Sequence, residues 1–270
     1  MKSLPVMCWP QEMIDPSGIR QSKPRTTGCT MILDKGLGLS AFRDLVSTAG
    51  DYIDWIKLGF GTPVLTPVPI LREKLAIAQS RGVILYPGGT MFEVAHAQGQ
   101  VERYFSALVE LGFTYMEISD GTVELSLKER ERYIRAALAN GLNVITEIGK
   151  KADGSFTPIP LLTEMYHRDR EAGAAFVIVE GRESGKNVGI YNEKGEADLE
   201  YLYTVHELIG SRFLIWEAPQ KSQQVQLLQA LGPDIHLGNV SPQETLAVEA
   251  LRRGLRSDTF SIGLRMERNE

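Results

Sequence analysis

Cysteine and histidine are scarce in this chain, and their scarcity excludes several classes of protein. The 270 residues include two cysteines, Cys8 and Cys29, and four histidines. Two cysteines cannot build a disulfide framework or a four-cysteine zinc site. None of the histidines has the spacing of a metal site or a catalytic triad. Cys29 lies in an apolar run, where we expect a small buried side chain.

Long hydrophobic runs and a large excess of one charge are also missing. No segment approaches the roughly 20 apolar residues of a membrane span, and the N-terminus lacks an adequate apolar core for a signal peptide. Lys and Arg total 29 and Asp and Glu total 34, so the formal net charge is −5. No overall positive field attracts nucleic acid or an anionic membrane. We therefore expect a soluble cytoplasmic protein without nucleic-acid or membrane partners.

Short apolar runs and amphipathic stretches alternate regularly after residue 26. Eight runs are strand candidates, and they recur about every 30 residues, the length of one βα unit. They span residues 29–34, 53–59, 83–87, 115–120, 143–149, 176–181, 213–218 and 235–239. The clearest helix spans 126–140, with a capping box of Ser126 and Glu129 and with Gly141 after its end. Residues 241–244 fit a second capping box.

This alternation predicts the α/β class, as a single (β/α)8 TIM barrel over residues 27–260. A short N-terminal arm, residues 1–26, holds four prolines, and a tail covers 261–270. A doubly wound open sheet is the alternative. Such a sheet would usually have fewer strands and need only one or two functional strand ends, whereas nearly every strand candidate here ends in polar residues.

Polar residues at the strand ends would converge at one mouth of the barrel, where TIM-barrel active sites lie. Alternation along each strand predicts that these side chains point inward: Asp34, Lys57, Tyr86, Glu117, Ser119, Glu147, Glu180, Arg182, Glu217 and Asn239. An interior salt bridge could explain any single residue of this set. The whole set favours function, because five of its members are carboxylates and few interior cations face them.

The surplus of carboxylates predicts a hard divalent cation, Mg²⁺ or Mn²⁺. Glu147, Glu180 and Glu217 follow consecutive strands and are the candidate metal ligands. Mg²⁺ usually takes one or two protein carboxylates together with water and substrate oxygens. We therefore expect that not all three bind the metal directly.

Cations and glycines in the loops suit an anionic substrate. Gly88, Gly89 and Thr90 could present backbone N–H groups to a phosphate, although a glycine pair more often forms a simple turn. Lys221 and Ser222 follow the seventh strand, where barrels often bind phosphate.

The loops after the fifth and sixth strands carry two further features. Lys150 and Lys151 are candidates for a catalytic acid or base, although a lone loop lysine is most simply solvated. The loop from Gly181 to about Glu196 is long and rich in glycine, as in a lid or a mobile surface loop. Its start resembles a phosphate-binding loop but has the wrong glycine spacing. Residues 36–41 loosely fit a dinucleotide fingerprint, but no acidic residue ends the second strand.

Eight segments resemble the phosphosulfolactate synthase family. They are LDKG at 33–36, DYIDWIKLGFGT at 51–62, YPGGTMFE at 86–93, EISDG at 117–121, TEIGKK at 146–151, EGRESGKNVGIY at 180–191, EAPQKSQQ at 217–224 and LRRGLRSDTF at 251–260. The resemblance covers roughly residues 24–260. It implies a (β/α)8 barrel that catalyses Mg²⁺-dependent addition of sulfite to phosphoenolpyruvate, giving (2R)-phospho-3-sulfolactate. This carbon–sulfur bond-forming lyase reaction begins coenzyme M biosynthesis in archaea, and bacterial relatives are linked to sulfolactate formation.

The resemblance also implies roles for individual residues. It makes Lys150 the general acid, with Lys151 as second choice. The phosphate, carboxylate and sulfite groups would be bound by cations and by small polar loop residues: Lys35, Lys57, Arg182 and Lys221, together with Gly88, Gly89, Thr90, Ser119 and Ser222.

Two alternative functions stay open from the sequence. One is a non-catalytic relative like the plant heat-stress-associated proteins, which need not keep the charged strand ends. The other is a barrel enzyme that combines phosphoenolpyruvate with a different nucleophile. For the synthase and for the alternative barrel enzyme, small-molecule substrates are the expected partners. A homo-oligomer is compatible with the sequence.

Overall fold

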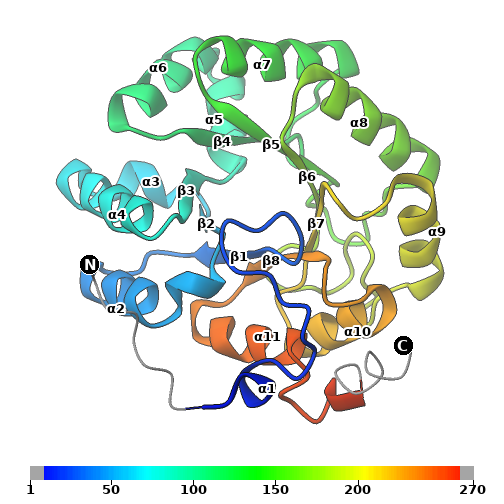
Figure 1. Ribbon diagram of the computed structural model, residues 1–270. Coiled ribbons are helices and arrows are strands. Elements are labelled where there is room, and N and C mark those ends of the chain that lie inside the picture. The colour runs from blue at the N-terminus through cyan, green and yellow to red at the C-terminus, as the bar shows by residue number, and fades with distance from the viewer. Residues whose placement is uncertain (1–8, 262–270) are drawn as a thin grey trace.

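A computed structural model describes residues 9–261, and eight parallel strands form its centre (Figure 1). The strands are β1 (Thr30–Asp34), β2 (Trp55–Leu58), β3 (Ile84–Pro87), β4 (Tyr115–Ile118), β5 (Asn143–Ile148), β6 (Phe176–Val179), β7 (Leu214–Glu217) and β8 (His236–Val240). They pair in the order β3-β2-β1-β8-β7-β6-β5-β4. Because β3 and β4 also lie in contact, the sheet is a nearly closed barrel. The predicted (β/α)8 fold is confirmed.

Helices surround the barrel as an outer ring (Figure 1). They are α2 (Leu39–Ala49), α3 (Thr62–Leu65), α4 (Val68–Ser80), α5 (Thr90–Ala97), α6 (Val101–Leu111), α7 (Leu127–Ala139), α8 (Ile159–Ala172), α9 (Leu199–Ile209), α10 (Lys221–Leu231) and α11 (Thr245–Arg252), with α1 (Gln11–Ile14) in the N-terminal segment. Two short 3-10 helices, η1 (Gly50–Tyr52) and η2 (Pro242–Glu244), complete the described elements. A second helix follows β3, so α5 and α6 both precede β4.

Two apolar clusters form the core. The larger one lies between the strands and the helix ring, and the smaller one fills the barrel interior. The interior cluster includes Met31, Trp55, Tyr86, Ile145 and Ile215, each from a different strand. Strand alternation sends these side chains inward and their neighbours toward the helices. The apolar interior leaves the carboxyl ends of the strands as the place where polar side chains gather.

The N-terminal segment closes the opposite end of the barrel. Arg20 forms an ion pair of 2.8 Å with Glu249 of α11, and the Gly28 N–H donates to the Asp234 carbonyl. The buried Arg252 donates to the carbonyls of Ile235 and Cys29 at the start of the strands. The segment crosses in front of β1 and β8 in Figure 1. The basic stretch around Arg252 therefore lies at the end of the barrel opposite the carboxyl ends of the strands.

The predicted helix caps and cysteine burial have mixed outcomes. The Ser126–Glu129 capping box is present at the start of α7, and Gly141 follows the helix in a left-handed conformation. The second predicted box is wrong, because the Ser241 hydroxyl donates to the Gln243 side chain and leaves the 3-10 helix η2 uncapped. Cys29 is buried as expected, and Cys8 lies outside the described residues.

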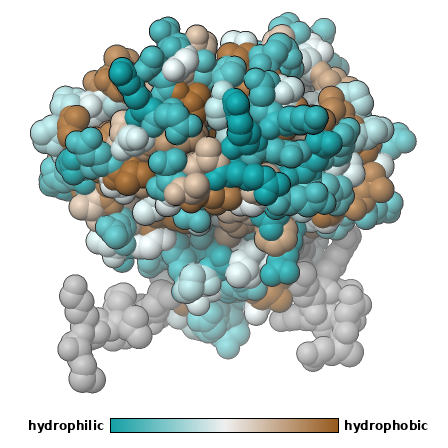
Figure 2. All heavy atoms as spheres, turned by 90° about the horizontal axis from the view of Figure 1, so that it is seen from above, coloured by the Kyte–Doolittle hydropathy of each residue, from teal (hydrophilic) through white to brown (hydrophobic). Residues whose placement is uncertain are grey.

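Hydrophilic side chains cover much of the face in Figure 2, with smaller hydrophobic groups among them. Within residues 9–261, no helix combines the length and the apolar character that a bilayer-spanning segment needs.

Candidate active site

A cavity of about 150 Å³ lies at the mouth formed by the carboxyl ends of the strands. Seven of the residues that were predicted to point inward line this cavity: Lys57, Glu117, Glu147, Glu180, Arg182, Glu217 and Asn239. The structure therefore brings together most of the polar strand ends, and Gly88, Gly89, Thr90 and Lys151 line the same cavity.

Lys57 is the electrostatic centre of this cavity. Its Nζ lies 2.7 Å from Glu147, 3.0 Å from Glu117 and 3.1 Å from Glu217. Burial alone would lower the pKa of Lys57, but these three carboxylates raise it well above its usual value. The ammonium is thus engaged on all sides by carboxylates, rather than free to bind an anionic substrate as the sequence suggested.

The three predicted metal ligands lie together. Glu147, Glu180 and Glu217 each offer a carboxylate oxygen, and these oxygens lie within 4.8 Å of one another. Burial, followed by repulsion from Glu147 and Glu217, raises the pKa of Glu180 well above its usual value. Burial also raises the pKa of Glu117, to about 8, against the attraction of Lys57. The cluster therefore holds more carboxylates than its own cations neutralise.

The two consecutive lysines point in different directions. Lys151 Nζ lies 3.3 Å from Glu147, 3.2 Å from Glu93 and 3.5 Å from the Thr90 hydroxyl, at the cavity wall. Lys150 Nζ donates instead to the carbonyls of Asp120 and Val123 in the β4–α7 loop.

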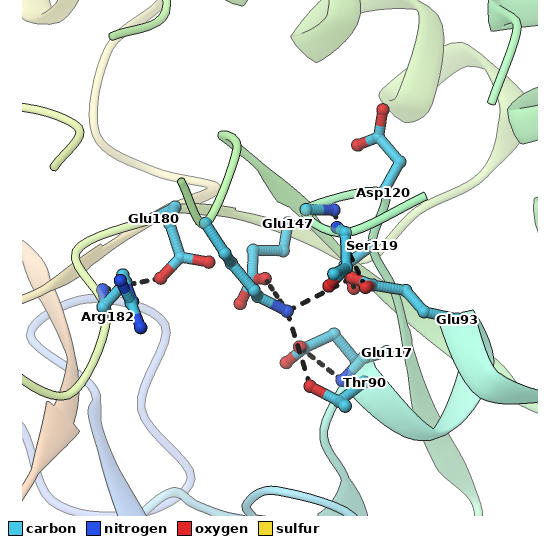
Figure 3. Close-up of polar contacts among 12 residues, drawn as sticks. Thr90, Glu93, Glu117, Ser119, Asp120, Glu147, Glu180 and Arg182 are labelled. Carbon is cyan, nitrogen blue, oxygen red and sulfur yellow. Dashed lines mark hydrogen bonds and ion pairs between the residues drawn. The ribbon is translucent and has the colours of Figure 1, made fainter. Parts of the chain in front are cut away.

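This placement reverses the order of choice between the two lysines. Lys150, the first choice for the acid, does not line the cavity. It pairs with Asp120, whose side chain points away from the glutamates of the mouth (Figure 3). A loop residue does not follow the inward–outward period of a strand, so the sequence could not separate the two lysines.

Glu93 is a site residue that the sequence analysis missed. It comes from helix α5 instead of a strand end, and its carboxylate turns toward Ser119 and the cavity (Figure 3). The Ser119 hydroxyl donates to Glu93, so this predicted substrate-binding group is engaged within the protein. The signal in the sequence was a glutamate among the apolar residues Met91, Phe92 and Ala95, and the structure shows that it is buried.

Two other residues predicted to point inward, Asp34 and Tyr86, do not line the cavity. Asp34 points into the helix layer, where it accepts a hydrogen bond of 2.8 Å from Lys74 of α4 and bonds from the N–H groups of Gly36 and Leu37. The expectation for Asp34 is wrong because Lys74 supplies a buried partner on the outer side. Tyr86 does point inward, but into the apolar layer below the mouth.

The glycine loop after β3 supports the carboxylates and does not offer free N–H groups. The Gly88 N–H donates to the Leu58 carbonyl, and the Gly89 N–H donates to Glu117 over 2.6 Å. A Cβ at Gly89 would lie 2.2 Å from the Ser119 hydroxyl oxygen, so only glycine fits there. These glycines line the cavity, but their N–H groups are already bonded.

A second cavity of about 380 Å³ adjoins the first and shares Leu33, Glu183 and Asn239 with it. Lys35 lines this second cavity and forms an exposed ion pair of 3.3 Å with Glu183. Lys221 and Ser222 line neither cavity.

The start of α10 differs from the sequence expectation. Lys221 pairs with Asp258 over 2.9 Å, and Gln220 caps the helix together with Gln223. Neither Lys221 nor Ser222 is therefore placed to bind a ligand in the two cavities.

The long loop between β6 and α9 packs against the first turn of α10. The buried Gln223 donates to the carbonyls of Gly185 and Gly195, and the Tyr191 hydroxyl donates to the Glu217 carbonyl. A lid motion of the whole loop would have to break these bonds. The exposed Arg182 and Glu183, at the start of the loop, lie at the mouth itself.

Known proteins with similar folds include aldolases and lyases. A crystal structure of the YdjI aldolase of Escherichia coli matches with a TM-score of 0.56, covering 89% of this chain and 86% of that chain, at 15% identity. Similarity at this level of identity concerns the fold alone.

Sequence relatives are more specific. A phosphosulfolactate synthase of Methanothermobacter thermautotrophicus is 44% identical over 89% of this chain and 94% of its own length. A Bacillus subtilis protein of the same name is 36% identical over 90% and 96%, respectively. The Arabidopsis thaliana protein HEAT-STRESS-ASSOCIATED 32 is 22% identical over 90% of this chain and 92% of its own. Residues 18–258 match the (2R)-phospho-3-sulfolactate synthase (ComA) family. The chain therefore belongs to the phosphosulfolactate synthase family.

Proposed function

We propose that the protein catalyses the Mg²⁺-dependent addition of sulfite to phosphoenolpyruvate, giving (2R)-phospho-3-sulfolactate. The reaction forms a carbon–sulfur bond and would be a lyase reaction of the cytoplasm. The observation that carries this proposal is a barrel mouth where the Lys151 ammonium faces an excess of buried carboxylates. Such a mouth suits a bound cation, a proton donor and an anionic substrate.

The carboxylate cluster fits a divalent cation. Among residues 9–261, one buried carboxylate oxygen of Glu180 and one of Glu117 have no hydrogen-bond partner. Buried carboxylates so close together are unfavourable unless a cation or a proton neutralises them. Glu147, Glu180 and Glu217 would hold Mg²⁺. When bound, Mg²⁺ would supply positive charge to the substrate carboxylate as negative charge builds there.

The reaction needs one proton donor. The sulfur of sulfite bonds to C3 of phosphoenolpyruvate, and the electron pair of the C2–C3 double bond moves to C2 and into the adjacent carboxylate. Lys151 then gives a proton to C2 and regains one from solvent, while the phosphate ester stays intact. Burial would lower the pKa of Lys151, but Glu147 and Glu93 raise it above its usual value. The lysine therefore holds a proton at neutral pH.

The second cavity suits the phosphate group of the substrate. It lies beside the loop after β8, a frequent phosphate site in barrels. Its cation, Lys35, pairs with Glu183 through an exposed contact that is weak in water. A phosphate group carries more charge than one carboxylate, so Lys35 can exchange Glu183 for phosphate.

Consumption of phosphoenolpyruvate tests the choice of nucleophile. Addition across the double bond removes the ultraviolet absorbance of the enol ester. We expect this loss with sulfite and Mg²⁺, and none with thiols or with water alone. Loss with another nucleophile but not with sulfite would favour a different barrel enzyme. Folded, metal-loaded protein that consumes no phosphoenolpyruvate under any condition would favour a non-catalytic relative.

A further inference from the structure

We propose that Glu93 and Gly121 together position the Lys151 ammonium in the barrel mouth. The inference rests on the proposed role of Lys151 as the proton donor, and it adds the residues that determine where this donor lies. Glu93 and Gly121 do not line the cavity, so they would act through Lys151 as positioning residues.

Glu93 joins three segments of the mouth through one carboxylate. Its side chain is 3% exposed, and its Oε1 accepts hydrogen bonds from the Ser119 hydroxyl, the Gly121 N–H over 3.0 Å and Lys151 Nζ over 3.2 Å. Its Oε2 accepts a bond of 3.0 Å from the Thr122 N–H. A buried carboxylate is stable only with such partners. Glu93 thereby ties the end of β4 and the β4–α7 loop to Lys151.

Gly121 supplies the space in which the Lys151 side chain lies. The Lys151 N–H donates to the Gly121 carbonyl over 3.1 Å, which fixes the two backbones side by side. A Cβ at Gly121 would lie 2.8 Å from Cγ of Lys151 and 2.9 Å from both Cδ and Cε. Gly121 is not in the left-handed region, so its backbone conformation does not require glycine. The requirement comes from the lysine stem.

Lys151 is therefore fixed at both ends of its side chain, which an ordinary loop lysine is not. Its stem lies against Gly121, and its ammonium lies between Glu93 and Glu147. A proton donor must lie within hydrogen-bond reach of the acceptor atom, and a displacement of about 1 Å can cost on the order of 100-fold in rate. Fixing Lys151 in advance avoids this loss.

Two substitutions separate positioning from charge and from folding. Gly121→Ala leaves every charge in place and moves only the flexible lysine stem. Gly38→Ala is its matched control, because a Cβ there meets nothing within 4 Å and Gly38 also lies outside the left-handed region. Glu93→Gln removes the anchor itself. For each variant we would measure kcat, the KM for phosphoenolpyruvate, the Kd for Mn²⁺ and the enantiomeric purity of the product at C2.

We expect kcat to fall by about 10- to 100-fold in Gly121→Ala and Glu93→Gln, with KM and the Mn²⁺ Kd within about twofold of the wild-type values. We also expect loss of enantiomeric purity, because water can protonate C2 from either side once the lysine is displaced. Gly38→Ala should match the wild type. Unchanged kcat in Gly121→Ala and Glu93→Gln would overturn the inference, as would parallel losses of kcat, substrate binding and metal binding, which indicate general damage. Wild-type protein that forms no product would instead contradict the proposed function. The positioning roles of Glu93 and Gly121, which rest on that function, would then be contradicted as well.

Discussion

At the scale of single residues, the two lysines of the mouth differ in how many carboxylates they contact and in how exposed they are. Lys57 is fully surrounded and forms ion pairs with three carboxylates on three strands. Lys151 contacts two carboxylates, and its side chain is 24% exposed at the cavity wall. Lys57 therefore neutralises the cluster from below, and Lys151 is the ammonium that a bound substrate can reach.

Replacement of Lys151 tests its assignment as the proton donor. We expect Lys151→Ala to lower kcat by about 10²- to 10⁴-fold, the usual contribution of a general acid. Lys150→Ala is the matched control, because it removes the same charge one residue away from the cavity. Steady-state kinetics of both variants decides between them, and a larger loss in Lys150→Ala would contradict the assignment.

Removal of one carboxylate tests the metal site. Glu180 has a buried oxygen without a hydrogen-bond partner among residues 9–261, so Glu180→Gln should raise the Kd for Mn²⁺ by at least about tenfold, or ~1.4 kcal/mol. Glu147→Gln should also weaken binding. Glu193→Gln removes an exposed carboxylate from the neighbouring loop and should leave the Kd unchanged. Titration calorimetry measures all three, and equal affinities in the wild type and Glu180→Gln would exclude this ligand.

Sequence reasoning placed most of the polar strand ends correctly, but it was wrong for Asp34, which bonds to Lys74 in the helix layer. Alternation placed Lys57, Glu117 and Glu147 in the mouth because a strand repeats every two residues. It could not place Lys150 and Lys151, which lie beyond the strand. Glu93 was missed because it lies within helix α5, and its contact with Ser119 and Lys151 depends on tertiary packing.

At the scale of elements, the β6–α9 loop is held in place by a glutamine of the next helix. Gln223 is fully buried, and it donates bonds of 2.6 Å and 3.1 Å to the carbonyls of Gly185 and Gly195. The same loop carries Arg182 and Glu183 to the mouth. Order in this loop therefore depends on α10 as much as on the loop sequence.

Loss of the Gln223 side chain should make the β6–α9 loop open more often. A lost buried hydrogen bond costs about 1–3 kcal/mol, so we expect Gln223→Ala to speed tryptic cleavage at Lys186 and Lys194 on the order of tenfold. Gln229→Ala, on the same helix but bonded to the Asp258 carbonyl, is the matched control. Mass spectrometry locates the cuts. Equal cleavage rates in Gln223→Ala and the wild type would show that other contacts hold the loop.

Elements were predictable where local chemistry alone determines them. All eight strands lie where apolar runs were found, and no strand end differs from the predicted one by more than two residues. Ser126 caps α7 because Glu129 returns the hydrogen bond. The similar pattern at Ser241 gives no cap, because the chain forms a 3-10 turn and the hydroxyl bonds to Gln243. The turn packs against α11 and β1, and these tertiary contacts are not contained in the local pattern.

At the scale of the whole molecule, the two ends of the barrel differ in how their buried polar groups are paired. The mouth holds an excess of buried carboxylates, whereas hydrogen bonds between the strand starts and the preceding segments close the opposite end. There the His236 ring accepts a bond of 3.1 Å from the Cys29 N–H at Nδ1 and lies 2.9 Å from the Arg212 carbonyl at Nε2. The His236 ring thus joins β8 to the residue before β1 and to the segment before β7.

Acid should weaken the fold through His236. Burial lowers its pKa from 6.5 to about 4, so the folded protein keeps the ring neutral while the unfolded chain takes up a proton. This contribution to the free energy of unfolding is complete above about pH 6.5 and is lost as the pH falls toward 4. We expect urea unfolding of His236→Gln to depend less on pH over this range. Parallel pH curves for the variant and the wild type would contradict this account.

The central claim is that this mouth joins sulfite to phosphoenolpyruvate without loss of phosphate. Phosphorus NMR of the purified protein with phosphoenolpyruvate, sulfite and Mg²⁺ tests it most directly, with parallel samples that lack sulfite or contain EDTA. We predict a new phosphate ester signal that requires both sulfite and the metal. Release of inorganic phosphate in place of this ester, or no change with folded and metal-loaded protein, would contradict the claim.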